Sequence, residues 1–125
     1  MVYLDTHIAI WLYAGLTDKF TQKARNIIDE NDLFISQIVR LELQYLYEIG
    51  RITDSPGQII KRLAGLINLK VSKHNFEEII IEAIKISWTR DVFDRIIVAE
   101  TKTQDCHLVT ADEKIIKHYK KAVWE

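Results

Sequence analysis

The stretch VYLDTH (residues 2–7) decides the fold, because its three apolar residues end abruptly at an acid. A short, wholly apolar run is typical of a strand buried on both faces of a parallel sheet. A helix is expected to begin near Thr6, so Asp5 should lie at the carboxyl end of this strand. In open α/β folds, functional groups gather beyond that end of the strands. Asp5 is therefore the first candidate site residue.

Working outward, strand-like and helix-like patterns alternate along the chain. Further strands are expected over Leu33–Ser36, Leu69–Val71, His107–Thr110 and Ala122–Trp124. Apolar stripes at helical spacing predict helices over Phe20–Ile28, Ile38–Ile49, Pro56–Ile67, Phe76–Ile86, from Asp94 onward and around Ile115–Tyr119. Gly50 closes the second of these helices and Ser55 caps the third. This alternation predicts an α/β sandwich with a mostly parallel central sheet.

Composition fits one compact domain over residues 1–125. The hydrophobic content is 48%, and 17 basic residues stand against 18 acidic ones for a net charge of −1. Any nucleic-acid partner must therefore be held locally, because the chain as a whole is not basic. The single cysteine, Cys106, cannot form an internal disulfide, and no signal peptide or long apolar run is evident. We expect a cytoplasmic protein with no membrane segment.

Three further acids are candidate site residues because of their positions in the predicted strands and helices. Asp112 follows a predicted strand, Asp94 opens a predicted helix, and Glu42 lies between core-facing positions of another helix. A buried carboxylate is costly unless something compensates its charge. One divalent cation would compensate all four, and Mg²⁺ or Mn²⁺ prefers such oxygen ligands.

Taken singly, each acid also has a simpler explanation. Asp5, Asp94 and Asp112 could each cap a helix, since a carboxylate there accepts hydrogen bonds from free backbone amides. Glu42 could point to solvent or pair with Arg40, and Asp91 could be a turn residue. Spacing alone does not decide between these explanations and a shared site.

Taken in chain order, however, the motifs around these acids form a recognisable series. They are the segment 3–7 followed by Trp11 and Leu12, Phe34–Ser36 with Glu42 on the next helix, RDVFDRIIVA (residues 90–99), and LVTAD (residues 108–112). The chain resembles the PIN-domain family, in particular the VapC-like toxins of bacterial and archaeal toxin–antitoxin pairs. The third motif is the most specific, and the series spans nearly the whole chain.

The resemblance implies a three-layer α/β/α sandwich and an endoribonuclease that uses Mg²⁺ or Mn²⁺. It implies RNA as the substrate, a VapB-like antitoxin as a partner, and a homodimer. On this pattern the metal-binding and catalytic acids are Asp5, Glu42, Asp94 and Asp112.

The resemblance also suggests supporting residues. Thr6, Ser36 and Thr110 match small polar positions that would hydrogen-bond the carboxylates or bound water, and Asp91 is a further acid of this outer group. Arg95 would contact a phosphate or form a structural ion pair. The chain departs from close relatives at Val92, where proline is common, and at Glu113, which directly follows Asp112, so no additional metal ligand is assigned.

Several other residues suggest a role less strongly. His7 is expected to pack or to hydrogen-bond near the site rather than to ligate a hard cation. Trp11, Trp88 and Trp124 could stack on bases, although buried packing is the default for large aromatic side chains. Lys114, Lys117, Lys120 and Lys121 could follow an RNA backbone or form a solvated helix face.

Two other functions are compatible with parts of the pattern. A non-catalytic PIN-like module that binds RNA or a partner would carry the same fold with purely structural acids. A phosphatase or phosphoreceiver would also place an aspartate after the first strand, but its companion lysine and second early aspartate are not recognisable here. Intact acids at every matched position favour the nuclease.

Overall fold

The protein is described by a computed structural model that covers residues 1–125 and contains one five-stranded sheet. The strands are β1 (Val2–Leu4), β2 (Leu33–Ile35), β3 (Lys70–Val71), β4 (His107–Val109) and β5 (Ala122–Val123). Their order is β3-β2-β1-β4-β5, and every neighbouring pair is parallel. The prediction of a mostly parallel sheet is confirmed, and all five strands end at the same edge.

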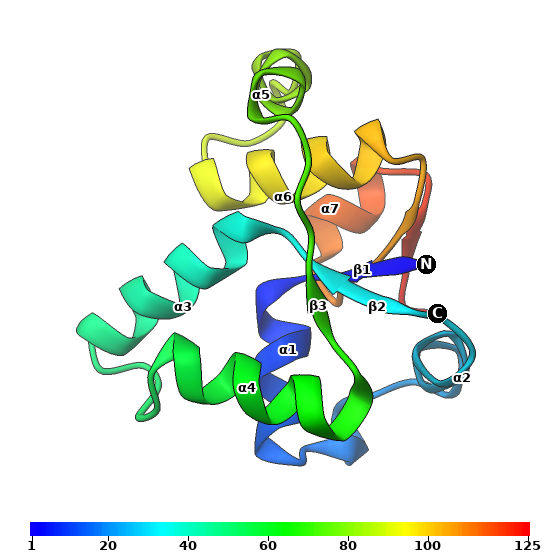
Figure 1. The fold of residues 1–125 in the computed structure, drawn as a ribbon. Helices are drawn as coiled ribbons and strands as arrows, with labels where there is room; N and C mark the ends of the chain where they lie inside the picture. The colour runs from blue at the N-terminus through cyan, green and yellow to red at the C-terminus, as the bar shows by residue number, and fades with distance from the viewer.

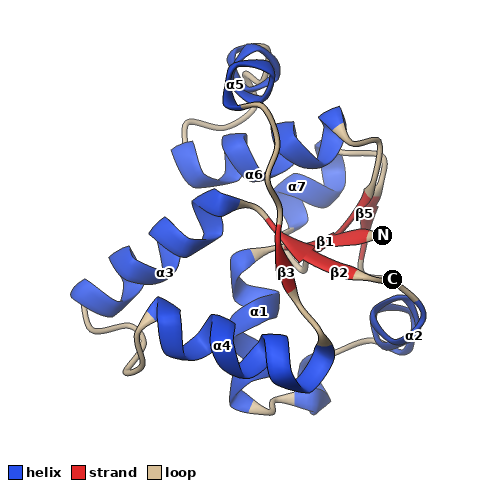
Figure 2. Ribbon diagram, in the orientation of Figure 1, coloured by secondary structure: helices blue, strands red, loops and turns tan.

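Helices cover both faces of this sheet. They are α1 (Thr6–Ala14), α2 (Gln22–Glu30), α3 (Gln37–Glu48), α4 (Pro56–Ile67), α5 (Phe76–Ile84), α6 (Val92–Thr103) and α7 (Glu113–His118), with a short 3₁₀ turn η1 (Thr17–Lys19). Figure 1 shows α1, α2 and α4 on one side of the sheet and α6 and α7 on the other, with α5 beyond α6. Helix α3 leaves the end of β2 and contacts α1, α4 and α6. The layered arrangement in Figure 2 is that of the predicted sandwich.

The central strand β1 is the most buried part of the sheet. Tyr3 and Leu4 are fully buried and Val2 is 1% exposed. Their side chains belong to one continuous apolar cluster that includes residues of both helical layers, such as Ile8 of α1 and Ile97 of α6. The wholly apolar run at residues 2–4 is thus explained by burial on both faces.

The structure corrects the start of α6. The helix begins at Val92 rather than at Asp94, because Asp91 has extended backbone angles and its Oδ1 accepts a hydrogen bond from the Asp94 amide at 3.1 Å. Asp91 is therefore the capping residue, and Asp94 lies inside the first turn. The carboxylate of Asp94 is left free of the capping role that its position in the sequence suggested.

Two other helix boundaries differ from the sequence pattern. Helix α2 begins at Gln22, after Phe20, because Thr21 Oγ1 caps it by accepting from the Ala24 amide at 3.1 Å. Helix α5 ends at Ile84, two residues before the predicted end at Ile86. Gly50 has the expected left-handed conformation after α3, with φ of 78°. No helix has both the length and the hydropathy that crossing a bilayer requires.

A buried glutamate joins α6 to the sheet. Glu100 is only 2% exposed, and its Oε1 accepts a hydrogen bond from Ser36 Oγ at 2.8 Å while its Oε2 accepts one from Ser72 Oγ. Ser36 follows β2 and Ser72 follows β3. The carboxylate thereby ties α6 to two strand ends, and its burial is compensated by two hydroxyl donors.

This junction predicts a measurable loss of stability. Glu100→Ala should lower the free energy of unfolding by about 2–3 kcal/mol, because both serine hydroxyls lose a buried carboxylate acceptor. Glu77→Ala, at an exposed position on α5, should change it by less than about 0.5 kcal/mol. Urea denaturation followed by circular dichroism measures both, and equal effects of the two substitutions would contradict the role given to Glu100.

Candidate active site

A pocket of about 280 Å³ opens at the carboxyl edge of the sheet. Its lining residues are Asp5, His7, Trp11, Glu42, Asp91, Asp94, Ala111 and Asp112. The four acids predicted from the sequence are all among them, together with Asp91. No lysine or arginine lines this pocket, so it concentrates negative charge.

Asp5 is the most deeply placed acid of the pocket. Its side chain is held on both oxygens, since the Thr6 amide donates to Oδ1 at 2.8 Å and Thr110 Oγ1 donates to Oδ2 at 2.7 Å. Burial raises the pKa of Asp5, and these two hydrogen bonds oppose the rise. Asp5 lies directly after β1 and Thr110 directly after β4. The parallel pairing of the two strands therefore builds this contact.

Glu42 reaches the pocket from α3. Thr6 Oγ1 donates a hydrogen bond to Glu42 Oε1, which links this acid to the start of α1. Burial raises the pKa of Glu42, and the nearby charge of Asp5 raises it further. Arg40, the alternative partner suggested by the sequence, instead donates to Gln37 Oε1 at 3.0 Å. Glu42 thus faces the other acids rather than a cation.

Asp94 has the most perturbed ionisation in the pocket. Burial and the charges of Asp5, Asp91, Asp112 and Glu42 together raise its pKa to about 8. No hydrogen bond to its side chain offsets this effect, in contrast to Asp5. At neutral pH the metal-free protein therefore keeps Asp94 largely protonated.

Asp91 and Asp112 cap helices and line the pocket at the same time. Asp112 Oδ1 accepts hydrogen bonds from the amides of Lys114 and Ile115 at 2.9 and 3.2 Å, and Asp91 Oδ1 accepts one from the Asp94 amide. In each side chain these bonds use Oδ1 alone and leave Oδ2 available. The capping and site explanations of Asp112 are therefore compatible.

Thr6 and Thr110 lie where the sequence predicted, each donating to a pocket acid. Ser36 does not line the pocket, and its hydroxyl donates instead to the buried carboxylate of Glu100 on α6. The guanidinium of Arg95 donates to the Ala83 carbonyl at 3.2 and 3.3 Å, bracing α6 against the end of α5. It forms no ion pair, which was one of the two roles expected from the sequence.

Two residues given no catalytic role by the sequence also line the pocket. His7 is exposed, and its nearness lowers the pKa values of Asp5 and Glu42 slightly against the larger effect of burial. Trp11 lies one helical turn after His7 on α1. This spacing of four residues after His7 is the signal that could have placed both side chains at the same site.

The donor chemistry of the pocket fits a hard divalent cation. Five carboxylates supply oxygen ligands, and a cation of charge +2 would relieve the repulsion that keeps Asp94 protonated. The side chains are not already arranged around a common point, since no group of three or more has ready-made coordinating geometry. The charge and donor type of the pocket, rather than a preformed cage, are what match such an ion.

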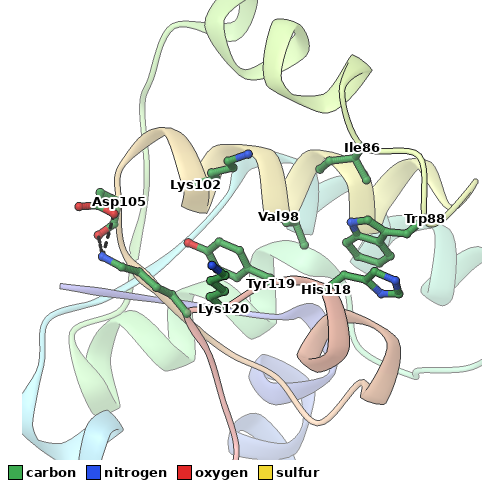
Figure 3. A pocket seen from close by; sticks show the side chains of 9 residues that line it. Ile86, Trp88, Val98, Lys102, Asp105, His118, Tyr119 and Lys120 are labelled. Atoms are coloured by element: carbon green, nitrogen blue, oxygen red, sulfur yellow. Dashed lines mark hydrogen bonds and ion pairs between the residues drawn. The ribbon is translucent and has the colours of Figure 1, made fainter.

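A second, slightly larger pocket has a different character. It has a volume of about 340 Å³ and lies between α6 and the end of α7, where the rings of Trp88 and His118 stack at 4.9 Å (Figure 3). Lys121 forms an ion pair with Asp105 at 2.7 Å at its other end. It contains none of the clustered acids, so the candidate chemistry belongs to the acidic pocket.

The raised pKa values predict an unusual pH dependence for the metal-free protein. Between the ordinary value of 3.8 and about 8, folded Asp94 binds more protons than the unfolded chain does. Stability must therefore fall as pH rises through this window. Chemical denaturation in chelator at several pH values should show this decline, and Asp94→Asn should flatten it. An equally steep decline in Asp94→Asn would contradict the assignment.

Known proteins share this fold. Among solved structures, VapBC2 from Rickettsia felis bound to a DNA fragment from the promoter matches with a TM-score of 0.66, 21% identity and full coverage of both chains. A toxin–antitoxin complex from Klebsiella pneumoniae matches with a TM-score of 0.64 and 18% identity, over 98% of this chain and 96% of that one. A search of curated sequences found no significant match. The PIN domain model matches residues 2–121, so the chain belongs to the PIN domain family.

Proposed function

We propose that this protein is a Mg²⁺- or Mn²⁺-dependent endoribonuclease and the VapC-like toxin of a toxin–antitoxin pair. The observation that carries the proposal is the convergence of Asp5, Glu42, Asp94 and Asp112 in one pocket that no lysine or arginine lines. Such a pocket repels an anionic substrate unless a cation is bound. Membership of the PIN domain family supports nuclease chemistry.

The four acids would hold the cation, with Asp91 beside them. When bound, a divalent ion supplies charge neutralisation at the phosphoryl group and lowers the pKa of a coordinated water. Thr110 and Thr6 keep Asp5 and Glu42 in fixed orientations through their hydroxyl donors. Asp94 holds a proton in the metal-free protein and must release it to act as a ligand.

We also propose a VapB-like antitoxin as the partner and the cytoplasm as the location. The two similar structures are a VapBC protein and a toxin–antitoxin complex, which supports an antitoxin for this chain as well. A soluble RNA substrate and a single unpaired cysteine suit a reducing compartment. The partner would bind the metal-free or metal-bound protein at or near the acidic pocket.

A homodimer completes the proposal. Leu41 and Tyr45 lie one turn apart on α3 and are 58% and 48% exposed, and Val92 of α6 is 62% exposed. The ring of Tyr45 packs against that of Phe93 at 5.8 Å, which joins the two helices into one partly apolar surface. Such a surface favours a protein interface.

The central test is RNA cleavage by the purified protein. Wild-type protein should cut RNA with added Mg²⁺ or Mn²⁺ and not in chelator, and Asp94→Asn should lose at least about 100-fold of the rate because a ligand is removed. Asp29→Asn, an exposed acid on α2, is the matched control and should retain activity. Cleavage that survives Asp5→Asn and Asp94→Asn, in preparations purified identically, would refute the proposal.

The dimer has its own test. Substituting Leu41→Lys and Tyr45→Lys together should convert the protein to a monomer, because two charges are placed on the apolar surface. Sedimentation velocity at several concentrations measures the change. Wild-type protein that is monomeric at micromolar concentration, or a double variant that stays dimeric, would count against this interface.

A further inference from the structure

The residues that directly follow β1, β4 and β5 form a row along the sheet edge, which runs from the acidic pocket to the side chain of Trp124. The Asp5 amide donates to the Val109 carbonyl at 3.0 Å, and the Thr110 amide donates to the Val123 carbonyl at 3.2 Å. Asp5, Thr110 and Trp124 therefore follow three adjacent strands, β1, β4 and β5, at the same level. Two strand spacings, about 10 Å, separate Asp5 from Trp124 along this edge.

Trp124 lines a hollow of about 430 Å³ next to the acidic pocket. Ala111 lines both, so the two hollows are neighbours. Ile116 and Ala122 supply apolar walls, Lys117 supplies an ammonium group, and Glu113 and Glu125 supply carboxylates. The hollow is thus larger and less acidic than the pocket beside it.

Trp124 is held firmly while part of its surface stays accessible. Its ring packs against Trp11 at 5.9 Å and against Phe20 at 5.8 Å, and its carbonyl accepts a hydrogen bond from Thr21 Oγ1. The residue is only half-buried, in contrast to the core side chains. Trp11 belongs to the acidic pocket, so one aromatic cluster spans the boundary between the two hollows.

We propose that this hollow binds a nucleobase of the RNA strand, one to a few nucleotides from the cleaved phosphate, with the base stacked on Trp124. The inference rests on the proposed nuclease function and adds a substrate subsite to it. A rigid indole loses little conformational freedom when a base stacks on it. Stacking on an aromatic side chain accepts any base, so this subsite contributes affinity more than sequence selectivity.

The lining of the hollow, with one lysine beside two glutamates, is less acidic than that of the acidic pocket with its five carboxylates. A phosphate within the acidic pocket needs a cation, whereas Ile116, Ala122 and the Trp124 ring offer apolar surface for a neutral base within the mixed lining of the hollow. Lys117 lines the hollow, and Nζ of Lys19 lies 5.0 Å from the centre of the Trp11 ring. With the base stacked on Trp124, these two ammonium groups would attract the phosphates on either side of that base. A stacked strand rises about 3.4 Å per nucleotide, so the 10 Å between Asp5 and Trp124 covers a few nucleotides.

Trp88 provides a matched control for Trp124. It is also half-buried and also lines a hollow, but that hollow shares no residue with the acidic pocket. Trp124→Leu and Trp88→Leu therefore remove the same ring from comparable surroundings. Trp124→Phe keeps a stacking surface and serves as the conservative variant.

The experiment measures both the cleavage and the binding of a short single-stranded RNA. Cleavage with Mg²⁺ gives KM and kcat, and binding in the Asp94→Asn background gives Kd without turnover. Trp124→Leu should raise KM and Kd about tenfold, the effect of losing one stacked base, with kcat and Mn²⁺ affinity unchanged. Trp124→Phe should restore most of the affinity, and Trp88→Leu should match wild type.

Three outcomes would overturn the subsite. Trp124→Leu could match Trp88→Leu in Kd, it could lower Mn²⁺ affinity and kcat with no change in KM, or Trp124→Phe could fail to restore binding. If Trp124→Leu does not fold, a protein with Trp11→Phe and Trp88→Phe retains Trp124 as its only tryptophan. Its fluorescence should then be quenched by RNA, and an unchanged signal would equally refute the subsite.

Failure of the subsite and failure of the proposed function give different results. Wild-type protein that cleaves RNA, combined with a silent Trp124→Leu, refutes only the subsite. Wild-type protein that neither binds nor cleaves RNA refutes the nuclease proposal and the subsite together.

Discussion

The rest of the structure depends on the burial of β1 between parallel neighbours. Val2, Tyr3 and Leu4 are almost fully buried, and their strand pairs with β2 on one side and β4 on the other. Because every strand is parallel, every strand end lies at one edge. That constraint brings together residues more than 100 positions apart in the chain, such as Asp5 and Thr110. The acidic pocket is a consequence of strand direction.

A buried glutamate and a half-buried aspartate of this fold differ in how their charges are compensated. Glu100 is almost wholly buried, yet serine hydroxyls donate to both of its oxygens, so its burial costs little. Asp94 has no such donor and faces other carboxylates, which raises its pKa to about 8. A compensated acid holds elements together. The repulsion around an uncompensated acid would be relieved by a ligand of opposite charge, so such an acid marks a candidate binding site rather than a structural junction.

The sequence predicted the sheet, the helices and the pocket acids because each leaves a local pattern. An apolar run ending in an acid marks Asp5, and the motif around Asp94 has a recognisable order. The same reasoning failed for Ser36, since a serine after a strand has the same local pattern whether it faces the pocket or Glu100. Nor does the sequence signal the hydrogen bonds of Arg95, because their acceptor, the Ala83 carbonyl, is a backbone atom without a sequence signature. The local sequence pattern predicts which residue types lie near a strand end, but their hydrogen-bond partners depend on tertiary packing.

Asp112 and Trp124 each combine a structural role with a proposed functional one. Capping by Asp112 does not exclude ligation, because its carboxylate has two oxygens and capping uses only Oδ1. Packing of Trp124 does not exclude stacking on a base, because Trp11 and Phe20 cover only part of the indole surface. At a sheet edge, side chains meet the core on one side and solvent on the other. Residues there can serve the fold and the site together, so a structural role is no argument against a functional one.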